Sequence, residues 1–296
     1  MRVTALLACH NRRESTLSSL DAFFRQQLPA SIFLSAIVVD DGSSDGTAAA
    51  VRASYPAAEV LREPGDLFWA RSMAKAEEVA LQDAPDCLLW LNDDVVLDRD
   101  GLARMLRVAE SKSDACVVVG AVRDPKSGSV TYSGLRRPGL HPLHVERVAP
   151  QGRPVAVTAF NGNVVLVPRS AGILIGSIDG DFEHAMADLD YGLRAIRVGV
   201  EVLLAPETVG TCPANTSGRA WLSPTLSTPD RIRALFGPKG IPARSLARFL
   251  RRHAGSTWFF WWGATYVKQV PHALVAGVRR PGRRLPGHPT AIRAKR

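Results

Sequence analysis

The decisive stretch of this sequence is Cys87-Leu88-Leu89-Trp90-Leu91-Asn92-Asp93-Asp94-Val95-Val96, an apolar run that ends abruptly in an amide and two carboxylates. Five consecutive apolar residues without alternation are typical of a strand covered on both faces, as in a parallel sheet. Ligands of open α/β sheets bind at the carboxyl ends of the strands. Asp93 and Asp94 are therefore expected where a metal ion and a phosphate meet. A polar turn that closes the strand is the alternative interpretation of this stretch alone.

A second acidic strand end upstream favours the ligand-binding interpretation. The apolar run of residues 33–39 ends in Asp40-Asp41-Gly42-Ser43-Ser44-Asp45-Gly46-Thr47, and a helical pattern follows. The Gly and Ser residues permit a tight turn and cap the next helix. Carboxylates at such a turn can accept hydrogen bonds from a nucleobase imide or from ribose hydroxyls, and helix capping is their simpler role.

Strand-like and helical patterns alternate along the first 121 residues. The strand-like runs are residues 3–9, 33–39, 59–61, 87–91 and 116–121. This alternation predicts a doubly wound, mostly parallel α/β sheet. Residues 123–154 lack clear periodicity and are expected to form an irregular excursion with a hairpin. A strand follows over 155–160 and 164–167, interrupted by a break at Asn161-Gly162-Asn163. A helix that begins near Asp188 and a last strand over 200–205 come after it.

Charge divides the chain unevenly. Residues 231–296 hold 15 Lys and Arg and no acidic residue, whereas residues 1–230 hold 22 basic against 28 acidic residues, a net charge of −6. We therefore expect a catalytic body over residues 1–230 and a basic extension over residues 231–296.

The extension combines arginines with aromatic residues. Arg244, Arg248, Arg251 and Arg252 gather on one side of a helical pattern, and three of the six tryptophans fall within residues 258–262. Aromatic rings beside arginines favour a bilayer interface with anionic headgroups, so we expect an anionic membrane surface as a partner and a folded body without residues 244–296. A helix packed on the body is the alternative. Nucleic-acid binding is not expected, because no recognised fold for it accompanies the charge.

The four cysteines form no CxxC pair, and three of them lie in apolar runs, so reduced thiols and a cytoplasmic location are expected. The first residues have the pattern of a strand and not of a signal peptide. No run of about 18 apolar residues predicts a transmembrane helix.

The motifs together resemble family 2 glycosyltransferases over roughly residues 3 to 212. The resemblance rests on their order: Ala8-Cys9-His10-Asn11-Arg12, Val38-Val39-Asp40-Asp41-Gly42-Ser43-Ser44-Asp45-Gly46-Thr47, Leu91-Asn92-Asp93-Asp94-Val95, Asn161-Gly162-Asn163 and Ala187-Asp188-Leu189-Asp190-Tyr191. It implies a GT-A fold and inverting transfer from a nucleotide-diphosphate sugar to a saccharide or lipid-linked saccharide. The rhamnosyltransferase-like branch is the most similar, which implies cell-surface polysaccharide biosynthesis at the inner face of the cell membrane.

The resemblance also implies roles on the donor side. Asn11, Asp40 and Asp41 would hold the nucleoside. Asp94, helped by Asp93, would hold a divalent metal, Mg²⁺ or Mn²⁺, on the donor pyrophosphate. Such an ion neutralises the charge that develops on a diphosphate leaving group, and carboxylates suit both metals.

On the acceptor side, Asp188 matches the general base of the family and Asp190 a neighbouring acceptor-site acid. Gly162 and Asn163 are expected beside the acceptor, because a break in a strand lets another molecule approach the backbone.

Two positions depart from the family pattern. Cys212 stands where many relatives have a metal-ligating His, and a thiolate suits Mg²⁺ poorly. Ala70-Arg71-Ser72-Met73 replaces the usual Gly and Asn at a helix start, so Arg71 becomes a candidate for the donor phosphates. A nucleotidyltransferase of similar fold and an inactive binding or scaffold protein are the alternative functions.

Overall fold

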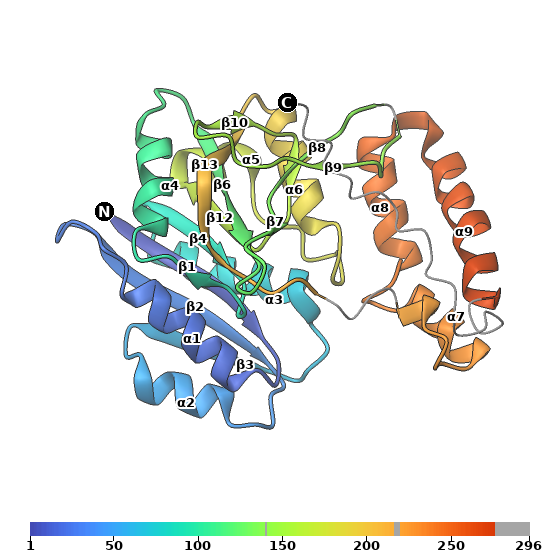
Figure 1. The fold of residues 1–296 in the computed structure, drawn as a ribbon, viewed down its shortest axis with the longest axis horizontal. Coiled ribbons are helices and arrows are strands. Elements are labelled where there is room, and N and C mark those ends of the chain that lie inside the picture. Colours follow the sequence, from blue (N-terminus) through green and yellow to red (C-terminus); the bar gives the residue numbers. More distant parts are fainter. Residues whose placement is uncertain (140, 216–219, 276–296) are drawn as a thin grey trace.

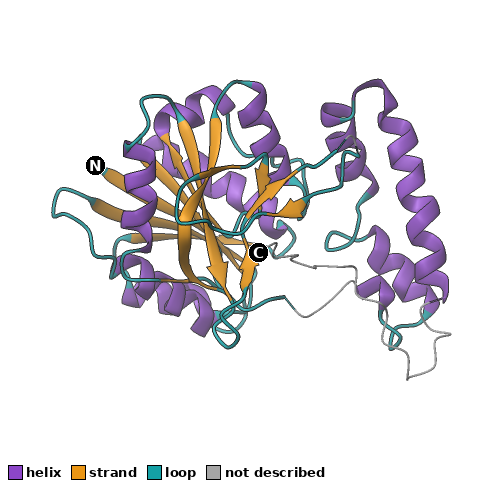
Figure 2. Ribbon diagram, turned by 45° about the horizontal axis from the view of Figure 1, so that its top comes forward, coloured by secondary structure: helices purple, strands orange, loops and turns teal. Residues whose placement is uncertain are grey.

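The computed structural model describes residues 1–139, 141–215 and 220–275. A large mixed sheet runs through the middle of the body (Figures 1 and 2). Its first half is parallel, in the order β3 (Ala58–Glu63), β2 (Phe33–Asp41), β1 (Arg2–Cys9) and β4 (Cys87–Leu91). The predicted mostly parallel α/β sheet is therefore confirmed.

The second half of the sheet begins with an antiparallel strand. β12 (Val164–Pro168) lies between β4 and β6 (Cys116–Arg123) and is antiparallel to both, while β13 (Glu201–Thr211) pairs parallel with β6. Three short strands complete the edges: β5 (Val96–Leu97), β7 (Val130–Tyr132) and β10 (Val155–Ala156).

Helices cover both faces of the sheet, which explains why β4 is apolar without alternation. Leu88 and Trp90 of β4 join the hydrophobic cluster under one set of helices, whereas Leu89 and Leu91 join the cluster on the other face. The first set is α3 (Phe68–Gln82), α5 (Arg169–Ile175) and α6 (Ala187–Arg197), and the second is α1 (Arg13–Phe24), α2 (Thr47–Ser54) and α4 (Gly101–Glu110). Both faces of β4 are thus removed from water.

The irregular excursion forms a small second sheet. β8 (Gly134–Arg136) pairs with β9 (Glu146–Arg147) and with β11 (Ala159–Phe160). The expected single strand over residues 155–160 is wrong, because the chain crosses between two sheets there. The Val157 N–H bonds to Val202 beside β10, and the Thr158 N–H bonds to Leu135 of β8.

The C-terminal part consists of helices beside the body (Figure 2). They are η1 (Ala220–Leu222), α7 (Thr228–Phe236), α8 (Ala243–His253), η2 (Gly255–Thr257) and α9 (Trp258–Val275). The proposed boundary at residue 230 lies inside α7, and the end of the extension, residues 276–296, lies outside the described residues. Of the helices that the structure describes, none is both long and apolar enough to cross a membrane.

Helix α8 packs on the body and α9 does so less closely. Leu246, Phe249 and Leu250 of α8 are fully or almost fully buried in the main hydrophobic cluster, whereas Phe259 and Phe260 of α9 are 64% and 60% exposed. These contacts argue against a body that folds unchanged without residues 244–296.

Candidate functional site

A polar pocket of about 520 Å³ lies at the carboxyl ends of β1, β2 and β4. We call it the carboxylate pocket. Its polar and aromatic lining comprises His10, Arg12, Asp41, Phe68, Trp69, Ser72, Asn92, Asp93, Asp94, Tyr132, Asn163, His184, Asn215 and Lys239. The three acids come from two strand ends that are far apart in the sequence. Sequence reasoning predicted this convergence, because parallel strands end at the same edge of a sheet.

Arg12 bridges the two carboxylates after β4. Its Nη1 atom lies 3.0 Å from Asp93 Oδ1 and 3.0 Å from Asp94 Oδ2. The Asp93 side chain is 8% exposed and that of Asp94 is 32% exposed. Burial, together with the neighbouring Asp94 charge, raises the pKa of Asp93 to about 6 even though Arg12 opposes the shift. One guanidinium group thus faces two carboxylates, and the second negative charge is not balanced by Arg12.

The carboxylate pair fits a hard divalent cation. Mg²⁺ and Mn²⁺ prefer oxygen ligands, and Mg²⁺ is commonly held by one or two carboxylates plus substrate phosphates. The described residues include no cluster of three His, Cys, Asp or Glu that could hold a metal by themselves. A cation bound by Asp93 and Asp94 would thus complete its coordination with substrate oxygens or water.

Cys212 sits beside this pair as a thiol. Its Sγ atom lies 3.4 Å from Asp94 Oδ1 and 3.8 Å from Asn163 Nδ2. Burial and the Asp94 charge both raise the pKa of Cys212 far above its ordinary value. The protonated sulfur donates to Asp94 in this structure.

The acids after β2 organise loops around the pocket. Asp41 accepts hydrogen bonds from the backbone N–H groups of Gly65, Leu67 and Phe68, and so fixes the start of α3. Asp40 accepts the Ser43 N–H through Oδ1, while its Oδ2 is buried without a hydrogen-bond partner in the described structure.

Asn11 also belongs to this loop system. It has a φ of 50°, its N–H donates to Ser43 Oγ at 2.9 Å, and its Oδ1 accepts the Ser44 N–H at 2.8 Å. Of the three residues expected to hold the nucleoside, Asp41 lines the pocket, whereas Asn11 and Asp40 are not among its lining residues.

Asp188 lies in the first turn of α6, as predicted. Its Oδ2 accepts the Gly162 N–H at 3.1 Å and its Oδ1 accepts the Leu189 N–H at 2.9 Å. Burial raises the pKa of Asp188, and these two N–H donors only partly counteract that shift. A carboxylate of raised pKa is a better proton acceptor.

Trp69 connects Asp188 to the carboxylate pocket. A Cβ at Gly162 would lie 2.6 Å from the Trp69 ring, so the indole packs directly on this glycine. The Trp69 Nε1–H donates to Asn92 Oδ1 at 2.9 Å, beside Asp93. Trp69 is the second residue of α3. The structure shows it lining the pocket and packing edge-on against Trp90 at 6.0 Å.

Asp190 lies on a different side of α6 and is completely buried. Its carboxylate bonds to Arg194 Nε at 2.8 Å, to Arg252 Nη1 at 2.7 Å and to His253 Nε2 at 2.8 Å. Burial would raise the pKa of Asp190, but the bonds from His253 and Arg194 outweigh burial and lower it. The structure therefore does not bring Asp190 together with Asp188, because residues two apart on a helix face different sides.

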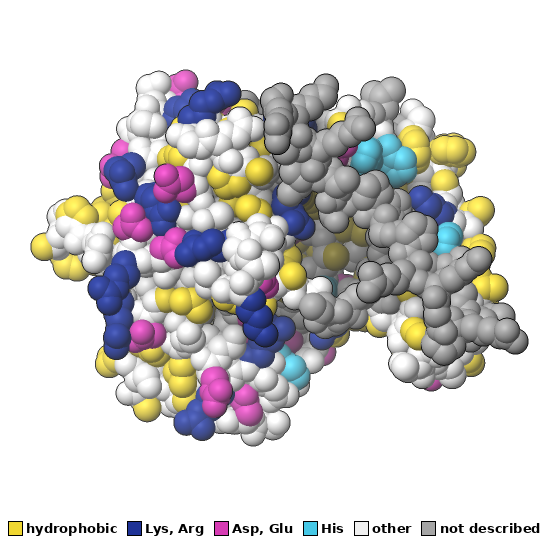
Figure 3. Space-filling model, in the orientation of Figure 1, with side chains coloured by type: hydrophobic (Ala, Val, Ile, Leu, Met, Phe, Trp, Pro, Cys, Tyr) yellow, Lys and Arg dark blue, Asp and Glu magenta, His cyan; other side chains and the backbone are white. Residues whose placement is uncertain are grey.

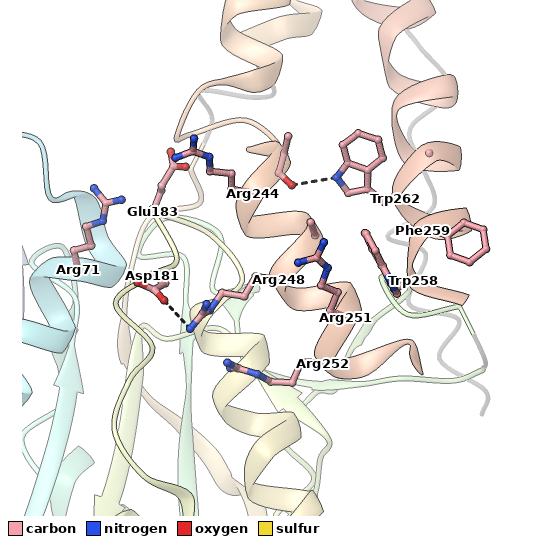
Figure 4. A pocket seen from close by; sticks show the side chains of 13 residues that line it. Arg71, Asp181, Glu183, Arg244, Arg248, Arg251, Arg252, Trp258, Phe259 and Trp262 are labelled. Carbon is pink, nitrogen blue, oxygen red and sulfur yellow. Dashed lines mark hydrogen bonds and ion pairs between the residues drawn. The ribbon is translucent and has the colours of Figure 1, made fainter. Parts of the chain in front are cut away.

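Arg71 does not line the carboxylate pocket either. It borders a separate groove together with Arg244 and Glu183 (Figure 4). A place among the donor phosphates is therefore not supported for Arg71, because the first turn of α3 directs Phe68 and Ser72 into the pocket and Arg71 away from it.

Lys239 and His184 are among the pocket residues that sequence reasoning missed. Lys239 comes from the loop between α7 and α8, and no sequence signal connects that loop to the strand ends. His184 was visible in an acid-rich segment but had no assigned role. Its Nδ1 atom is buried without a partner among the described residues, and burial and the Lys239 charge lower its pKa.

Residues 4–162 match the family model described as Glycosyl transferase family 2. The chain belongs to glycosyl transferase family 2. It is 28% identical over 215 residues to an N-acetylglucosaminyl-diphospho-decaprenol L-rhamnosyltransferase of Mycobacterium tuberculosis (strain ATCC 25618 / H37Rv), a match that covers 63% of this chain and 69% of that protein. The predicted family and its rhamnosyltransferase-like character are thereby confirmed.

Solved structures support the fold of this family 2 glycosyltransferase. The mannosyltransferase PcManGT from Pyrobaculum calidifontis, solved with GDP-Man and Mn²⁺, is 19% identical with a TM-score of 0.54, over 93% of this chain and 72% of that one. S. aureus TarS 1-349 in complex with UDP is 11% identical with a TM-score of 0.56, over 94% and 90% of the two chains. The expected GT-A type of fold is therefore confirmed.

Proposed function

We propose that this family 2 glycosyltransferase moves a sugar, a rhamnosyl or another hexosyl group, from a nucleotide-diphosphate donor to a hydroxyl of a saccharide or lipid-linked saccharide. The observation that carries the proposal is the connection of two carboxylate sites. Asp93 and Asp94 line the donor-sized pocket, and Trp69 and Gly162 link that pocket to Asp188. The lipid-diphosphate acceptor in the name of the Mycobacterium tuberculosis relative supports the lipid-linked alternative and a role in cell-surface polysaccharide biosynthesis.

The carboxylate pocket has the charge pattern that a nucleotide diphosphate and a divalent cation need. Asp93 and Asp94 would hold Mg²⁺ or Mn²⁺, which when bound neutralises the charge on the departing diphosphate. Arg12 counterbalances the two acids, and Lys239 adds an ammonium group to the lining. Asp41 keeps the start of α3 in place under the nucleoside end of the donor.

Asp188 is the proposed base. As the acceptor oxygen forms its bond to the anomeric carbon, its proton passes to the Asp188 carboxylate. The bond between that carbon and the diphosphate oxygen breaks from the opposite face, and the diphosphate leaves with the electron pair. The raised pKa of Asp188 supports this role, because proton transfer is most efficient when the pKa of the base approaches the working pH.

The proposal includes a location at the cytoplasmic face of the cell membrane. Helix α9 exposes Phe259, Phe260 and Val267, with Arg251 near its start. Aromatic residues next to arginines suit a bilayer interface. On this proposal residues 1–230 carry the transfer chemistry and residues 231–296 form the membrane-facing extension, which also supplies Lys239 to the pocket.

The test is a panel of UDP-, dTDP- and GDP-sugars offered with an N-acetylglucosaminyl diphosphate lipid, with release of nucleoside diphosphate as the readout. We expect release from one sugar class that depends on the acceptor and is accompanied by anomeric inversion. Pyrophosphate release from a nucleoside triphosphate would instead indicate a nucleotidyltransferase. Absence of both reactions with every donor would indicate a binding protein.

A further inference from the structure

A second cavity of about 1290 Å³ lies between the body and the C-terminal helices (Figure 4). Residues of α3, of the loop before α6, of α8 and of α9 line it. Five arginines contribute to its wall: Arg71, Arg244, Arg248, Arg251 and Arg252. We call this cavity the arginine groove. Four of these arginines lie on one face of α8, because their spacing of four, seven and eight residues from Arg244 follows the helical repeat.

Two of the arginines are engaged by acids. Arg248 bonds to Asp179 at 2.8 Å and to Asp181 at 2.7 Å, and Arg252 bonds to Asp179 at 2.8 Å and to Asp190 at 2.7 Å. These pairs fix α8 on the body. The charges of Arg248 and Arg252 are therefore compensated within the protein, and both side chains are held in place in the groove wall.

The other three arginines have no carboxylate partner within the described part of the chain. Arg71, Arg244 and Arg251 are all exposed, and the remaining acid of the lining is Glu183. Figure 4 shows Arg71 and Arg244 on either side of Glu183. Three guanidinium groups against one carboxylate leave a surplus of two positive charges, which is the charge that a diphosphate diester neutralises.

Aromatic rings continue the wall from this charge toward the exposed face of α9. The Arg251 guanidinium lies over the Trp258 ring, 4.4 Å from its centroid, which holds it in place. Trp262 is held by a bond from its Nε1–H to Ala243 O at 3.1 Å. Phe259 is 64% exposed at the groove, and hydrophobic side chains gather along the edge of the molecule that α9 forms (Figure 3).

The arginine groove and the carboxylate pocket share a wall. Arg71 lines the groove, and Ser72, the next residue of α3, lines the pocket. Likewise, Glu183 lines the groove and its neighbour His184 lines the pocket. A sugar attached to a group in the groove therefore starts next to the donor site.

We propose that the arginine groove binds the diphosphate of a polyprenyl-linked acceptor, with Arg71, Arg244 and Arg251 on the phosphates and the prenyl chain along Phe259. This inference rests on the proposed glycosyl transfer and assigns the place of its acceptor. Guanidinium groups suit the task, because they bind phosphate oxygens in a bidentate manner and stay charged. The combination of a two-charge surplus with an adjoining apolar surface selects an amphiphilic diphosphate over a free anion.

The test is a calorimetric titration of the full-length protein with farnesyl diphosphate, with the donor pocket kept filled by saturating nucleoside diphosphate. We expect binding to the wild type and an affinity lower by about 10- to 100-fold in Arg244→Gln/Arg251→Gln. The control is Arg107→Gln/Arg153→Gln, which removes two exposed arginines outside the groove lining. It should leave the affinity unchanged, and both double variants should bind nucleoside diphosphate normally.

Two further ligands separate the sources of affinity. Farnesol lacks the diphosphate, and dioctanoyl phosphatidylglycerol carries one phosphate diester; we expect both to bind at least tenfold more weakly than farnesyl diphosphate. If farnesol binds as tightly as farnesyl diphosphate, the groove is only an apolar surface. If phosphatidylglycerol binds as tightly, the groove is a general surface for anionic lipids. Either result overturns the proposal. So does unchanged affinity in the Arg244→Gln/Arg251→Gln variant or loss of all binding under saturating nucleoside diphosphate. Because binding is measured without turnover, a failure of glycosyl transfer would leave these results standing.

Discussion

Gly162 donates its backbone N–H to Asp188 Oδ2 at 3.1 Å, and this bond fixes the proposed base from a segment 26 residues upstream. The second oxygen is held by the Leu189 N–H of the base's own helix. Both carboxylate oxygens therefore have defined directions before any substrate arrives. Such fixed geometry lowers the entropic cost of positioning a base against a hydroxyl.

Asp188→Asn tests the base directly. Asn keeps only one of the two backbone bonds, because Gly162 and Leu189 donate to different oxygens of Asp188 and the amide has a single oxygen. We therefore expect a loss of stability of about 1–3 kcal/mol, while donor binding remains near normal. Transfer should fall by about 10²- to 10⁴-fold, because the amide cannot take the proton. Thermal midpoint, donor affinity and transfer rate on this variant separate the two roles. Transfer within a few-fold of wild type would show that Asp188 only caps the helix.

The same residue sets a pH dependence. The base must be ionised to act, and burial raises its pKa above the ordinary value for Asp of about 3.9. The transfer rate of the wild type should therefore decline as the pH falls, with a midpoint above that of an ordinary Asp. The pH profile of kcat measures this midpoint, and a profile that stays flat down to pH 4 would argue against Asp188.

Gly162→Ala tests the contact between the two sites. The new Cβ would lie 2.6 Å from the Trp69 ring, so the indole must shift and strain its 2.9 Å bond to Asn92. We expect a loss of stability of about 1–3 kcal/mol and a fall in turnover of about tenfold or more. Gly139→Ala is the control, because a Cβ there meets no atom within 4 Å. If Gly162→Ala and Gly139→Ala had the same stability and turnover, the position of Trp69 would not matter for catalysis.

Asp94→Ala tests the proposed metal pair. Loss of one carboxylate should weaken Mn²⁺ binding and lower metal-dependent turnover by about 10²-fold or more, since a bound ion supplies several kcal/mol of charge stabilisation. Calorimetric titration with Mn²⁺ in the presence of nucleoside diphosphate gives a readout independent of activity. Asp114→Ala, at an exposed position outside the pocket lining, is the matched control. Undiminished wild-type activity in EDTA would remove the metal role.

The parts of this molecule that could be predicted are those set by local pattern. The run Cys87–Leu91 is apolar because both faces of its strand are buried, and its acidic end therefore marks the ligand edge of the sheet. The first-turn position of Asp188 likewise followed from helical spacing.

The parts that were missed depend on contacts between distant segments. The sequence placed Asp190 beside Asp188 by number, but its three partners come from its own helix and from α8, about 60 residues later. The approach of Lys239 to the carboxylate pocket has the same origin. Helical periodicity could have shown that Asp188 and Asp190 face different sides, but not which cations cover the second carboxylate.

The exposed aromatic residues of α9 give a prediction about the membrane. Phe259→Ser/Phe260→Ser should lower the affinity of the full-length protein for anionic vesicles about tenfold or more, because two exposed apolar side chains are lost while α8 remains packed. Vesicle sedimentation at low and high salt measures this, and salt should weaken the arginine contribution. Ile173→Ser/Leu174→Ser is the control, since both side chains are exposed on α5 instead of α9. If the wild type does not bind anionic vesicles at low salt, α9 is not a membrane-binding helix.

The Asp190 cluster gives a prediction about stability. Asp190→Asn removes the negative charge that compensates Arg194 and Arg252, whose side chains are 17% and 27% exposed, so we expect a loss of about 3 kcal/mol in the free energy of unfolding. Asp21→Asn is the control, because its pair with Arg25 is exposed and worth less than about 1 kcal/mol.

The sign of the pH effect on this cluster follows from the lowered pKa of Asp190. A carboxyl group whose pKa is lower in the folded state than in the unfolded state stabilises the fold above the unfolded value of about 3.9, and that contribution is lost as the pH falls through the folded value. The difference in unfolding free energy between wild type and Asp190→Asn should therefore be full at pH 6–7 and shrink below about pH 4. Urea unfolding of both proteins at a series of pH values measures the difference. A difference that stays constant down to pH 2 would mean that the cluster acts through packing and not through charge.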